Sequence, residues 1–188
     1  MPPGEAASLG IHESQSRLWE NLVGRSPEFW EWCHPIARKA FPESFNDVSP
    51  STLAKAVRSV NPNFIRVEAD EVTYNLHVMM RFDLEREIIH GNLLVADLPS
   101  AWNERFEADF GRRPSRIEYG VLQDIHWPAG LIGYFPTYTL GNIFSAQIMA
   151  AAQQSGVGTP QQIRDGEFAP LLHWLRENVH AFGRIYTS

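Results

Sequence analysis

The chain has little cysteine, a deficit of basic charge and no long apolar run. Cys33 is the single cysteine among 188 residues, which excludes an internal disulfide and a thiolate metal cluster and favours a reducing, cytoplasmic location. No apolar run approaches the ~20 residues that span a membrane, and the first ten residues, MPPGEAASLG, have neither the basic nor the apolar region of a signal peptide. Because 22 acidic residues outnumber 16 basic ones and the net charge is −6, we expect no nucleic-acid partner and no membrane partner.

Apolar and aromatic residues are present in ordinary globular amounts. Apolar residues make up 44% of the chain, and six Trp, five Tyr and eleven Phe supply the aromatic rings. A chain of this length can bury a sizeable core, and its aromatic side chains suit either that core or a groove for an organic ligand. No internal repeat divides the sequence, so we expect residues 1–188 to belong to one domain.

The apolar spacing, together with helix start and stop residues, predicts a mainly α-helical fold with at most a small β element. Ser26 and Pro27 suit the N-cap and first position of a helix, and glycines follow several of the expected helices. The predicted helices cover residues 6–23, 27–41, 51–60, 101–110, 142–154 and 167–182. We expect residues 64–67 to be extended, Pro99 to break the chain, and the segment 120–141, rich in Gly and Pro, to be irregular.

Residues 72–84 fit two kinds of secondary structure. Every even position from Val72 to Leu84 is apolar, and the odd positions are polar except Met79, which is the period of a strand. Thirteen residues are long for a strand, however, and the charged run 85–87 continues without a turn signal. We therefore predict a long buried helix that is capped near Asp70.

Two acidic positions could bind metal by their spacing. Glu13 follows His12 and precedes Arg17 by four residues, so it could be a metal ligand oriented by its neighbours or half of a surface ion pair. Glu87 and His90 form Glu-x-x-His, a pattern of carboxylate-bridged di-iron bundles. Those sites need a second such pair and two further glutamates, so a solvated helix end is the simpler interpretation.

Arg66 and residues 123–127 are the other polar candidates. Arg66 could hold a carboxylate through its planar guanidinium or pair with Asp70 or Glu68. Residues 123–127 contain an amide, an acid, an imidazole and an indole, namely Gln123, Asp124, His126 and Trp127. His126 could donate to a developing oxyanion while Asp124 fixes its tautomer; a satisfied polar turn is the alternative.

The remaining candidates are aromatic and imidazole side chains. Tyr134 and Tyr138, just downstream, could line the same cleft or be core tyrosines. We expect His77, His173 and His180, on predicted helices, to be core or surface residues.

Three stretches of the chain contain recognisable motifs. The first, GIHESQSRLWENLVGRS, contains His-Glu-Ser-Gln. The second, residues 65–70, has the pattern Ile-Arg-x-x-Ala-Asp, and the third, residues 120–127, has the pattern Gly-x-x-Gln-Asp-x-His-Trp. These motifs, in this order, resemble those of the carboxypeptidase Taq family of zinc metallocarboxypeptidases, and the resemblance covers essentially residues 4–186.

The resemblance implies a helical fold with a long substrate groove, a homodimer, and removal of single residues from peptide C-termini by a zinc-activated water. Arg66 would receive the terminal carboxylate of the substrate, and His126 would assist the transition state. Tyr138 would touch the substrate near the scissile bond, while Gln123 and Trp127 would shape the closed end of the groove.

The same resemblance assigns Glu13 as a zinc ligand, with supporting roles for His12, Arg17, Asp70 and Asp124. The family's other two zinc ligands and its general base lie in a His-Glu-x-x-His helix. This sequence contains no His-Glu-x-x-His, no His-Pro-Phe and no Asp-x-Arg-x-Thr. It therefore resembles a C-terminal portion of the enzyme, shortened at both ends.

One glutamate cannot hold zinc in a site that needs three protein ligands and a water, and no base for that water is evident. We therefore expect this chain alone to be an inactive part of a carboxypeptidase. Two alternatives stay open: a module that binds peptide C-termini without catalysis, and half of a split enzyme completed by a separate N-terminal chain. The shortening should also expose apolar helix faces that the missing part would cover, which predicts self-association, an exposed groove or limited stability.

Overall fold

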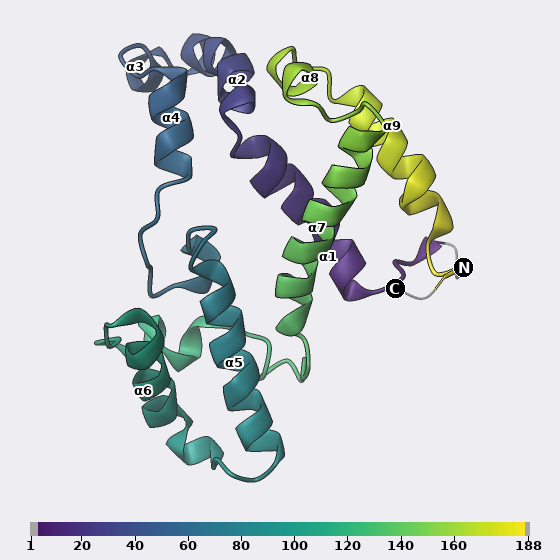
Figure 1. The fold of residues 1–188 in the computed structure, drawn as a ribbon. Helices are drawn as coiled ribbons and strands as arrows, with labels where there is room; N and C mark the ends of the chain where they lie inside the picture. Colours follow the sequence, from purple (N-terminus) through teal and green to yellow (C-terminus); the bar gives the residue numbers. More distant parts are fainter. Residues whose placement is uncertain (1–3, 187–188) are drawn as a thin grey trace. The chain divides into compact units, whose positions relative to one another are not determined.

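The computed structural model describes residues 4–186, and these residues form helices, turns and loops without a strand (Figure 1). This confirms the prediction of a mainly α-helical fold. The chain divides into two compact units: the first comprises Met1–Ser59 and Leu140–Ser188, and the second comprises Val60–Thr139. Among the described residues, none of the helices combines the length and apolar character needed to cross a bilayer.

Helix N-caps and prolines start most helices of the first unit. The side chains of Ser8, Ser26, Ser49 and Thr159 accept hydrogen bonds from backbone N–H groups in the first turn, which satisfies donors that have no partner inside the helix. The helices of this unit are α1 (Leu9–Arg17), α2 (Pro27–Ala40), α3 (Pro42–Phe45), α4 (Pro50–Val57), α8 (Pro160–Arg164), α9 (Ala169–Asn178) and most of α7 (Pro136–Gln154).

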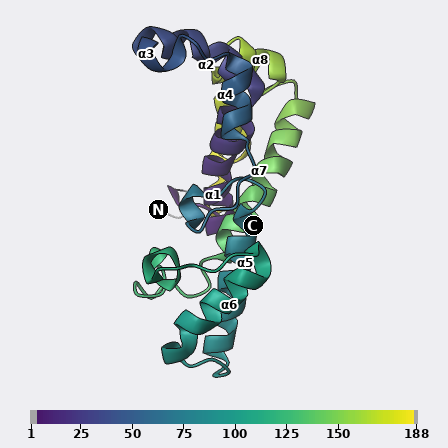
Figure 2. The same ribbon diagram turned by 90° about the vertical axis from the view of Figure 1, so that its left-hand side faces the viewer.

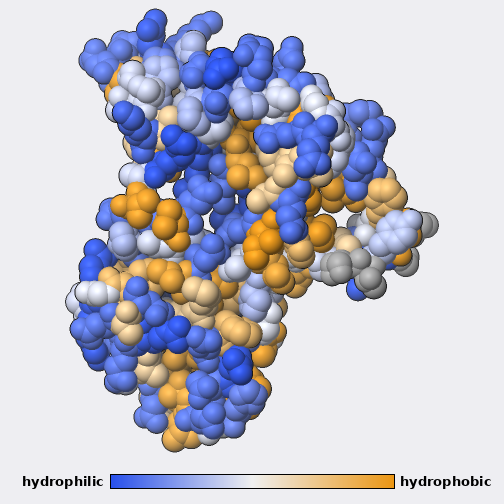
Figure 3. All heavy atoms as spheres, viewed as in Figure 1, coloured by the Kyte–Doolittle hydropathy of each residue, from blue (hydrophilic) through white to orange (hydrophobic). Residues whose placement is uncertain are grey.

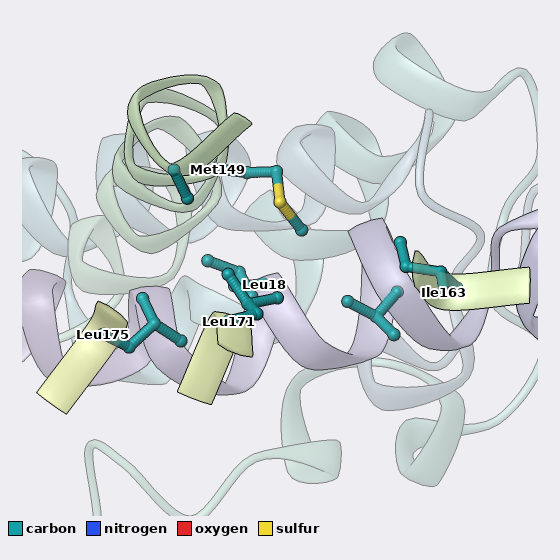
Figure 4. Packing of buried hydrophobic residues seen from close by; sticks show 7 residues of the cluster. Leu18, Met149, Ile163, Leu171 and Leu175 are labelled. Carbon is teal, nitrogen blue, oxygen red and sulfur yellow. The ribbon is translucent and has the colours of Figure 1, made fainter. Parts of the chain in front are cut away.

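The core of the first unit gathers side chains from helices that are far apart in the sequence. Figure 4 shows Leu18, Met149 and Leu171 pointing toward one another, with Ile163 and Leu175 beside them. Leu18 and Leu175 are fully buried, and burying one such side chain stabilises a fold by roughly 1.5–3 kcal/mol. The core therefore joins η2 (Leu18–Gly24), which directly follows α1, with α7, α8 and α9.

Glycines allow α1 and α7 to approach closely inside the first unit. A Cβ added at Gly141 would lie 2.7 Å from Cγ of Glu13, and a Cβ added at Gly10 would lie 3.1 Å from the ring of Phe144. The first distance is shorter than any normal carbon–carbon contact. The backbone of α7 therefore lies directly against the side chain of Glu13.

Helices α5 (Tyr74–Ile89) and α6 (Leu98–Phe110) form the second unit and lie side by side in both views (Figures 1 and 2). The unit also contains four short 3-10 turns. In chain order, η3 (Arg66–Glu68) precedes α5, η4 (Val95–Asp97) lies between the two helices, and η5 (Ile117–Tyr119) and η6 (Val121–Gln123) follow α6. Their shared core contains Met80, Leu84, Leu98, Trp102 and Phe106. Trp102 and Phe106 are almost fully buried.

The side chain of Asp70 accepts hydrogen bonds from the turn that leads into α5. Its Oδ1 accepts from the backbone N–H groups of Val72 and Thr73 at 2.9 and 2.8 Å, and its Oδ2 accepts from the Thr73 hydroxyl at 2.7 Å. These bonds lower the pKa of Asp70 against the opposing effect of its burial. The segment 72–84 is helical from Tyr74 onward, with Thr73 at the N-cap position and Asp70 in the turn before it. The strand suggested by the alternating apolar residues does not form.

The predicted extended element at residues 64–67 is wrong beyond Ile65. Ile65 has extended backbone angles, but Arg66–Glu68 form a 3-10 turn. The backbone N–H of Ile65 donates to the side chain of Asn63 at 3.0 Å, and that of Arg66 donates to the side chain of Gln123 at 2.9 Å. Side chains therefore supply the bonds that a neighbouring strand would supply in a sheet.

Two predicted helix starts are wrong because of proline. Pro99 does not break the chain but lies in the first turn of α6, and α7 starts at Pro136 instead of residue 142. Proline fits a first turn because the missing N–H would have no partner there. The predicted helix 6–23 continues past α1 as a π-helical segment, η2 (Leu18–Gly24), and residues 167–182 end as α9 followed by the turn η7 (His180–Phe182).

Candidate functional site

Two arginines share one aspartate in the second unit. Arg66 donates to Oδ1 of Asp124 from Nε at 3.0 Å and from Nη2 at 2.8 Å. Arg81 donates from Nε to Oδ2 of the same carboxylate at 2.6 Å, and Nη1 of Arg66 donates to the hydroxyl of Tyr74 at 3.0 Å. Arg81 is fully buried and Arg66 is 5% exposed, so this ionic cluster belongs to the interior of the unit.

The partner of Arg66 is thus not one of the acids expected from the sequence. Asp70 binds the turn that precedes α5, and the predicted ion pair of Arg66 with Asp70 or Glu68 is wrong. Asp124 replaces them although it lies 58 residues away along the chain. A buried guanidinium needs a partner that is buried as well, and the side chain of Asp124 is only 9% exposed.

Burial and charge act in opposite directions on the pKa values in this cluster. Burial alone would raise the pKa of Asp124, but the charges of Arg81 and Arg66 outweigh it and hold that pKa below its ordinary value. Burial lowers the pKa of Arg66, yet Asp124 outweighs this effect and the pKa is raised. For Arg81 burial dominates and lowers the pKa to about 10. All three groups are charged at neutral pH, so the cluster has one positive charge in excess.

His126 is a buried imidazole beside this cluster. Its Nε2 and the hydroxyl of Tyr138 share a hydrogen bond of 2.9 Å. Its Nδ1 lies 3.7 Å from Oδ1 of Asp124 and has no hydrogen-bond partner among the described residues. The expectation that Asp124 fixes the tautomer is therefore wrong, because both oxygens of that carboxylate accept from arginines.

The surroundings of His126 favour its neutral form. Burial lowers its pKa, and the positive charges of Arg66 and Arg81 act in the same direction, while the charge of Asp124 opposes them. The net shift is downward, so the ring is neutral at pH 7 and can donate from one nitrogen and accept at the other.

Aromatic rings enclose the same space. The guanidinium of Arg66 lies 4.7 Å from the ring centre of Tyr138, within the range of a cation–π contact. The ring of His126 lies 4.5 Å from Phe135 and 5.3 Å from Tyr134. The structure therefore brings Arg66, His126, Tyr134 and Tyr138 together, as the sequence suggested.

Gln123 joins two segments of the site through its amide. Its Oε1 accepts from the backbone N–H of Arg66 at 2.9 Å, and its Nε2 donates to the carbonyl of Phe64 at 3.0 Å and to that of Gly120 at 3.1 Å. These bonds hold the turn of Arg66 against the turn that precedes Asp124. A contact of Gln123 with substrate stays a prediction.

Trp127 lines an apolar groove of about 500 Å³ in the second unit. Its indole Nε1 donates to Oε2 of Glu85 at 2.7 Å, and Asp124 and Glu85 also line the groove. Ile89, Ile117, Leu122 and Ile132 form part of the wall and are at least half exposed. Figure 3 shows hydrophobic residues as orange areas on the face in view. Exposed apolar side chains around a concave surface are a feature of many ligand-binding and protein-binding sites.

Glu13 lies in the first unit, where its carboxylate pairs with Arg17. Oε1 of Glu13 lies 3.0 Å from Nε of Arg17, which is the i,i+4 ion pair expected from the spacing. The neighbouring His12 lines a second cavity of the first unit, together with Gln15 and His180. Metal binding by Glu13 stays a prediction.

Metal-binding side chains do not gather in threes: among residues 4–186 no group of three His, Cys, Asp or Glu could hold an ion. Glu87 and His90 are both exposed at the end of α5, which matches a solvated helix end. The side chain of His173 is 73% exposed, whereas His77 is fully buried.

Sequence reasoning missed Arg81 and Glu85. Both lie in or next to the segment whose alternating pattern resembled a strand, and both read as polar surface positions. The available signal was the spacing of His77, Arg81 and Glu85, four residues apart, which places them on one helix face once the segment is taken as a helix.

The chain is similar to known proteins in sequence and in structure. Residues 1–188 match the carboxypeptidase Taq (M32) metallopeptidase family. The chain is 50% identical over 182 residues to thermostable carboxypeptidase 1 of Thermus thermophilus. The aligned region covers 97% of this chain and 36% of that protein. It is 40% identical over 180 residues to carboxypeptidase 1 of Bacillus subtilis, with 96% and 36% covered.

Solved structures give the same result. The M32 carboxypeptidase from Deinococcus radiodurans R1 superposes with a TM-score of 0.92 at 47% identity, covering 98% of this chain and 37% of that one. The Pyrococcus furiosus carboxypeptidase superposes with a TM-score of 0.92 at 44% identity, covering 97% and 36%. The chain therefore spans little more than a third of the length of the relatives it matches, and it corresponds to a C-terminal portion of them.

Proposed function

Because the chain belongs to the carboxypeptidase Taq (M32) metallopeptidase family, we propose that it forms the part of a metallocarboxypeptidase that receives the C-terminus of a peptide substrate. Arg66 would bind the terminal carboxylate, His126 would donate a hydrogen bond to the oxygen that becomes negative in the transition state, and Tyr138 would contact the substrate near the scissile bond. Gln123 and Trp127 would shape the closed end of the groove.

The observation that supports this proposal most is the excess positive charge of the buried cluster. Two guanidinium groups face the single carboxylate of Asp124, and a second carboxylate would balance them. The contacts of Arg66 use three of its five N–H donors. The neutral imidazole of His126 and the hydroxyl of Tyr138 lie beside this charge, where a scissile amide next to a bound carboxylate would be placed.

The family implies a divalent metal, and we propose zinc, with Glu13 as one of its ligands. The donors in the described residues do not fit a complete zinc site, because such a site needs three protein ligands and no group of three gathers here. The carboxylate of Glu13 is half-buried and oriented by Arg17, which suits one ligand of a site whose other ligands lie outside these 188 residues. The homodimer, the separate N-terminal half and the cytoplasmic location stay predictions of the resemblance.

Binding of a free C-terminus is the test of this proposal. A fluorescent peptide with a free terminal carboxylate should bind the full chain, and the same peptide with a terminal amide should bind at least 10-fold more weakly. Arg66→Met should remove this preference, because a charge-assisted hydrogen bond is worth about 1.5–3 kcal/mol, or roughly 10- to 100-fold in Kd. Fluorescence anisotropy measures both constants.

Arg86→Met is the matched control, since Arg86 is an exposed arginine of α5. Arg66→Lys keeps the charge and loses the planar fork, so it should bind with intermediate affinity. Equal affinity for acid and amide, or an acid preference that survives Arg66→Met, would contradict the proposal.

Hydrolysis by the chain alone is not part of the proposal. The sequence has no His-Glu-x-x-His, and therefore no evident base for a metal-bound water. Purified chain supplied with zinc should release no C-terminal residue from a peptide. Release that depends on zinc would show that other donors complete the site.

A further inference from the structure

Helix α5 directs three polar side chains into the interior of the second unit. His77, Arg81 and Glu85 follow one another at intervals of four and are 0%, 0% and 5% exposed. Charged groups are buried only where hydrogen bonds or opposite charges compensate them. The partners of Arg81 and Glu85 lie in residues 124–133, the segment that contains His126.

Arg81 determines how Arg66 meets Asp124. An isolated arginine and carboxylate prefer two parallel N–H···O bonds, one to each oxygen. Here Arg81 takes Oδ2 of Asp124 at 2.6 Å, so Nε and Nη2 of Arg66 both donate to Oδ1. This turns the guanidinium of Arg66 and directs its Nη1 to the hydroxyl of Tyr74.

Arg81 is itself held rigidly. Its Nη1 donates to the carbonyl of His77 at 2.8 Å, and its guanidinium lies 4.5 Å from the ring centre of Trp102. These contacts and its full burial restrict the Arg81 side chain, and its Nε bond to Asp124 restricts that carboxylate in turn.

Glu85 fixes the other end of the segment. Its Oε2 accepts from the indole of Trp127 and its Oε1 accepts from the backbone N–H of Gly133, each at 2.7 Å. Gly133 has a φ of 73°, a conformation that favours glycine. Within the segment, the carbonyl of His126 accepts from the backbone N–H of Leu131 at 2.9 Å. His126 thus lies between the Asp124 anchor and the two Glu85 anchors.

We propose that Arg81 and Glu85 are positioning residues of the peptide site: Arg81 orients Arg66 through Asp124, and Glu85 holds the segment that presents His126. The inference rests on the proposed function, in which Arg66 and His126 contact the peptide. Neither Arg81 nor Glu85 touches the peptide; each acts through its hydrogen-bond partners.

The pKa of His126, measured by NMR on the full chain labelled with ¹⁵N-histidine, tests the role of Glu85. The titratable and charged groups that face His126 are Asp124, Arg66, Arg81, Tyr134 and Tyr138. If Glu85 acted only as a distant negative charge, Glu85→Gln would lower the pKa of His126. If Glu85 holds the segment, Glu85→Gln frees it, the imidazole gains solvent, and the pKa rises toward its ordinary value of about 6.5.

We expect the rise in Glu85→Gln and no change in Glu87→Gln, which removes the same charge from an exposed position of α5. A pKa that falls or stays constant in Glu85→Gln would overturn the inference. Should Glu85→Gln not fold, hydrogen exchange in the unaltered chain decides: the Trp127 indole and the Gly133 amide should exchange at least 100-fold more slowly than in an open chain. Open-chain rates at these two groups would overturn it.

Peptide binding tests the role of Arg81. Arg81→Met keeps much of the apolar stem and removes the donors, so Asp124 can turn both oxygens to Arg66. The preference for a free carboxylate over an amide should fall at least 10-fold, and Arg81→Lys should restore part of it. An unchanged preference in folded Arg81→Met would overturn this role. If the unaltered chain shows no acid preference, the proposed function fails, while the NMR and exchange results still decide whether α5 holds the segment.

Discussion

Lowering the pH should destabilise the second unit through His77, a fully buried imidazole on α5. Its ring centre lies 4.5 Å from that of Phe110 and 5.7 Å from that of Phe106. Burial, reinforced by the positive charge of Arg81, lowers the pKa of His77 to about 3. The folded chain therefore keeps His77 neutral at pH values where the unfolded chain protonates it.

The sign and size of the effect follow from linkage. The folded pKa lies below the unfolded value of about 6.5, so the unfolded state binds the proton first and stability falls as the pH drops from about 6.5 toward 3. Between pH 7.5 and pH 5 the loss from this one group is about 2 kcal/mol. That is a large share of the ~5–15 kcal/mol that stabilises a typical domain.

Urea denaturation followed by circular dichroism, at pH 7.5 and pH 5, measures this loss. In His77→Leu the titrating group is gone and the apolar neighbours keep a partner, so the unaltered chain should lose about 2 kcal/mol more than this variant. His173→Leu removes an exposed imidazole and should keep the full pH dependence. Equal losses in the unaltered chain and in His77→Leu would refute the reasoning.

Two further substitutions test the packing around the charged groups. Gly141→Ala should destabilise the fold by about 1–3 kcal/mol through overpacking, because its Cβ would lie 2.7 Å from Cγ of Glu13. Gly10→Ala should cost less, because its Cβ would meet the ring of Phe144 at 3.1 Å. A larger loss of thermal stability in Gly10→Ala than in Gly141→Ala would contradict this geometry. Asp124→Asn leaves two buried guanidinium groups uncompensated and should cost about 3–5 kcal/mol in urea denaturation. Asp83→Asn, in a half-exposed pair, should cost under about 1 kcal/mol, and a similarly small loss for Asp124→Asn would show that the cluster does not stabilise the fold.

Local signals in the sequence predicted most helices of this chain. Ser26 followed by Pro27 starts α2, and Gly111 ends α6 with a φ of 68°, a conformation that glycine adopts without strain. The short helix α8 was missed although Thr159 and Gln162 form a capping box. Its five residues are too few for an apolar period to show.

The partners of the charged residues could not be predicted by the same means. Asp124 lies 58 residues from Arg66 and 43 from Arg81, and no local pattern links such positions. The motifs assigned Arg66 and His126 to one site, and the structure places both residues beside Asp124. Arg81 and Glu85 belong to none of these motifs, so only the structure shows that they hold the motif residues.

The hydrogen bonds of Asp124 also explain why this carboxylate does not bond the ring of His126. An acid two residues before a histidine suggests a hydrogen bond between them, as in catalytic pairs. The two arginines bind the carboxylate more strongly than a neutral imidazole could, since their charge is opposite and permanent. The histidine therefore keeps Tyr138 as its partner and the aspartate serves the arginines.

The close approach of Gly141 to Glu13 has a consequence for how that carboxylate is held. Main-chain atoms of α7 form the surface against which the side chain of Glu13 rests, and main-chain atoms are the same for every amino acid. A side chain at position 141 would occupy the space that the Glu13 side chain fills, so the absence of a Cβ at Gly141 sets the room that Glu13 has. This contact restricts the Glu13 side chain, and part of its conformational entropy is therefore lost when the chain folds.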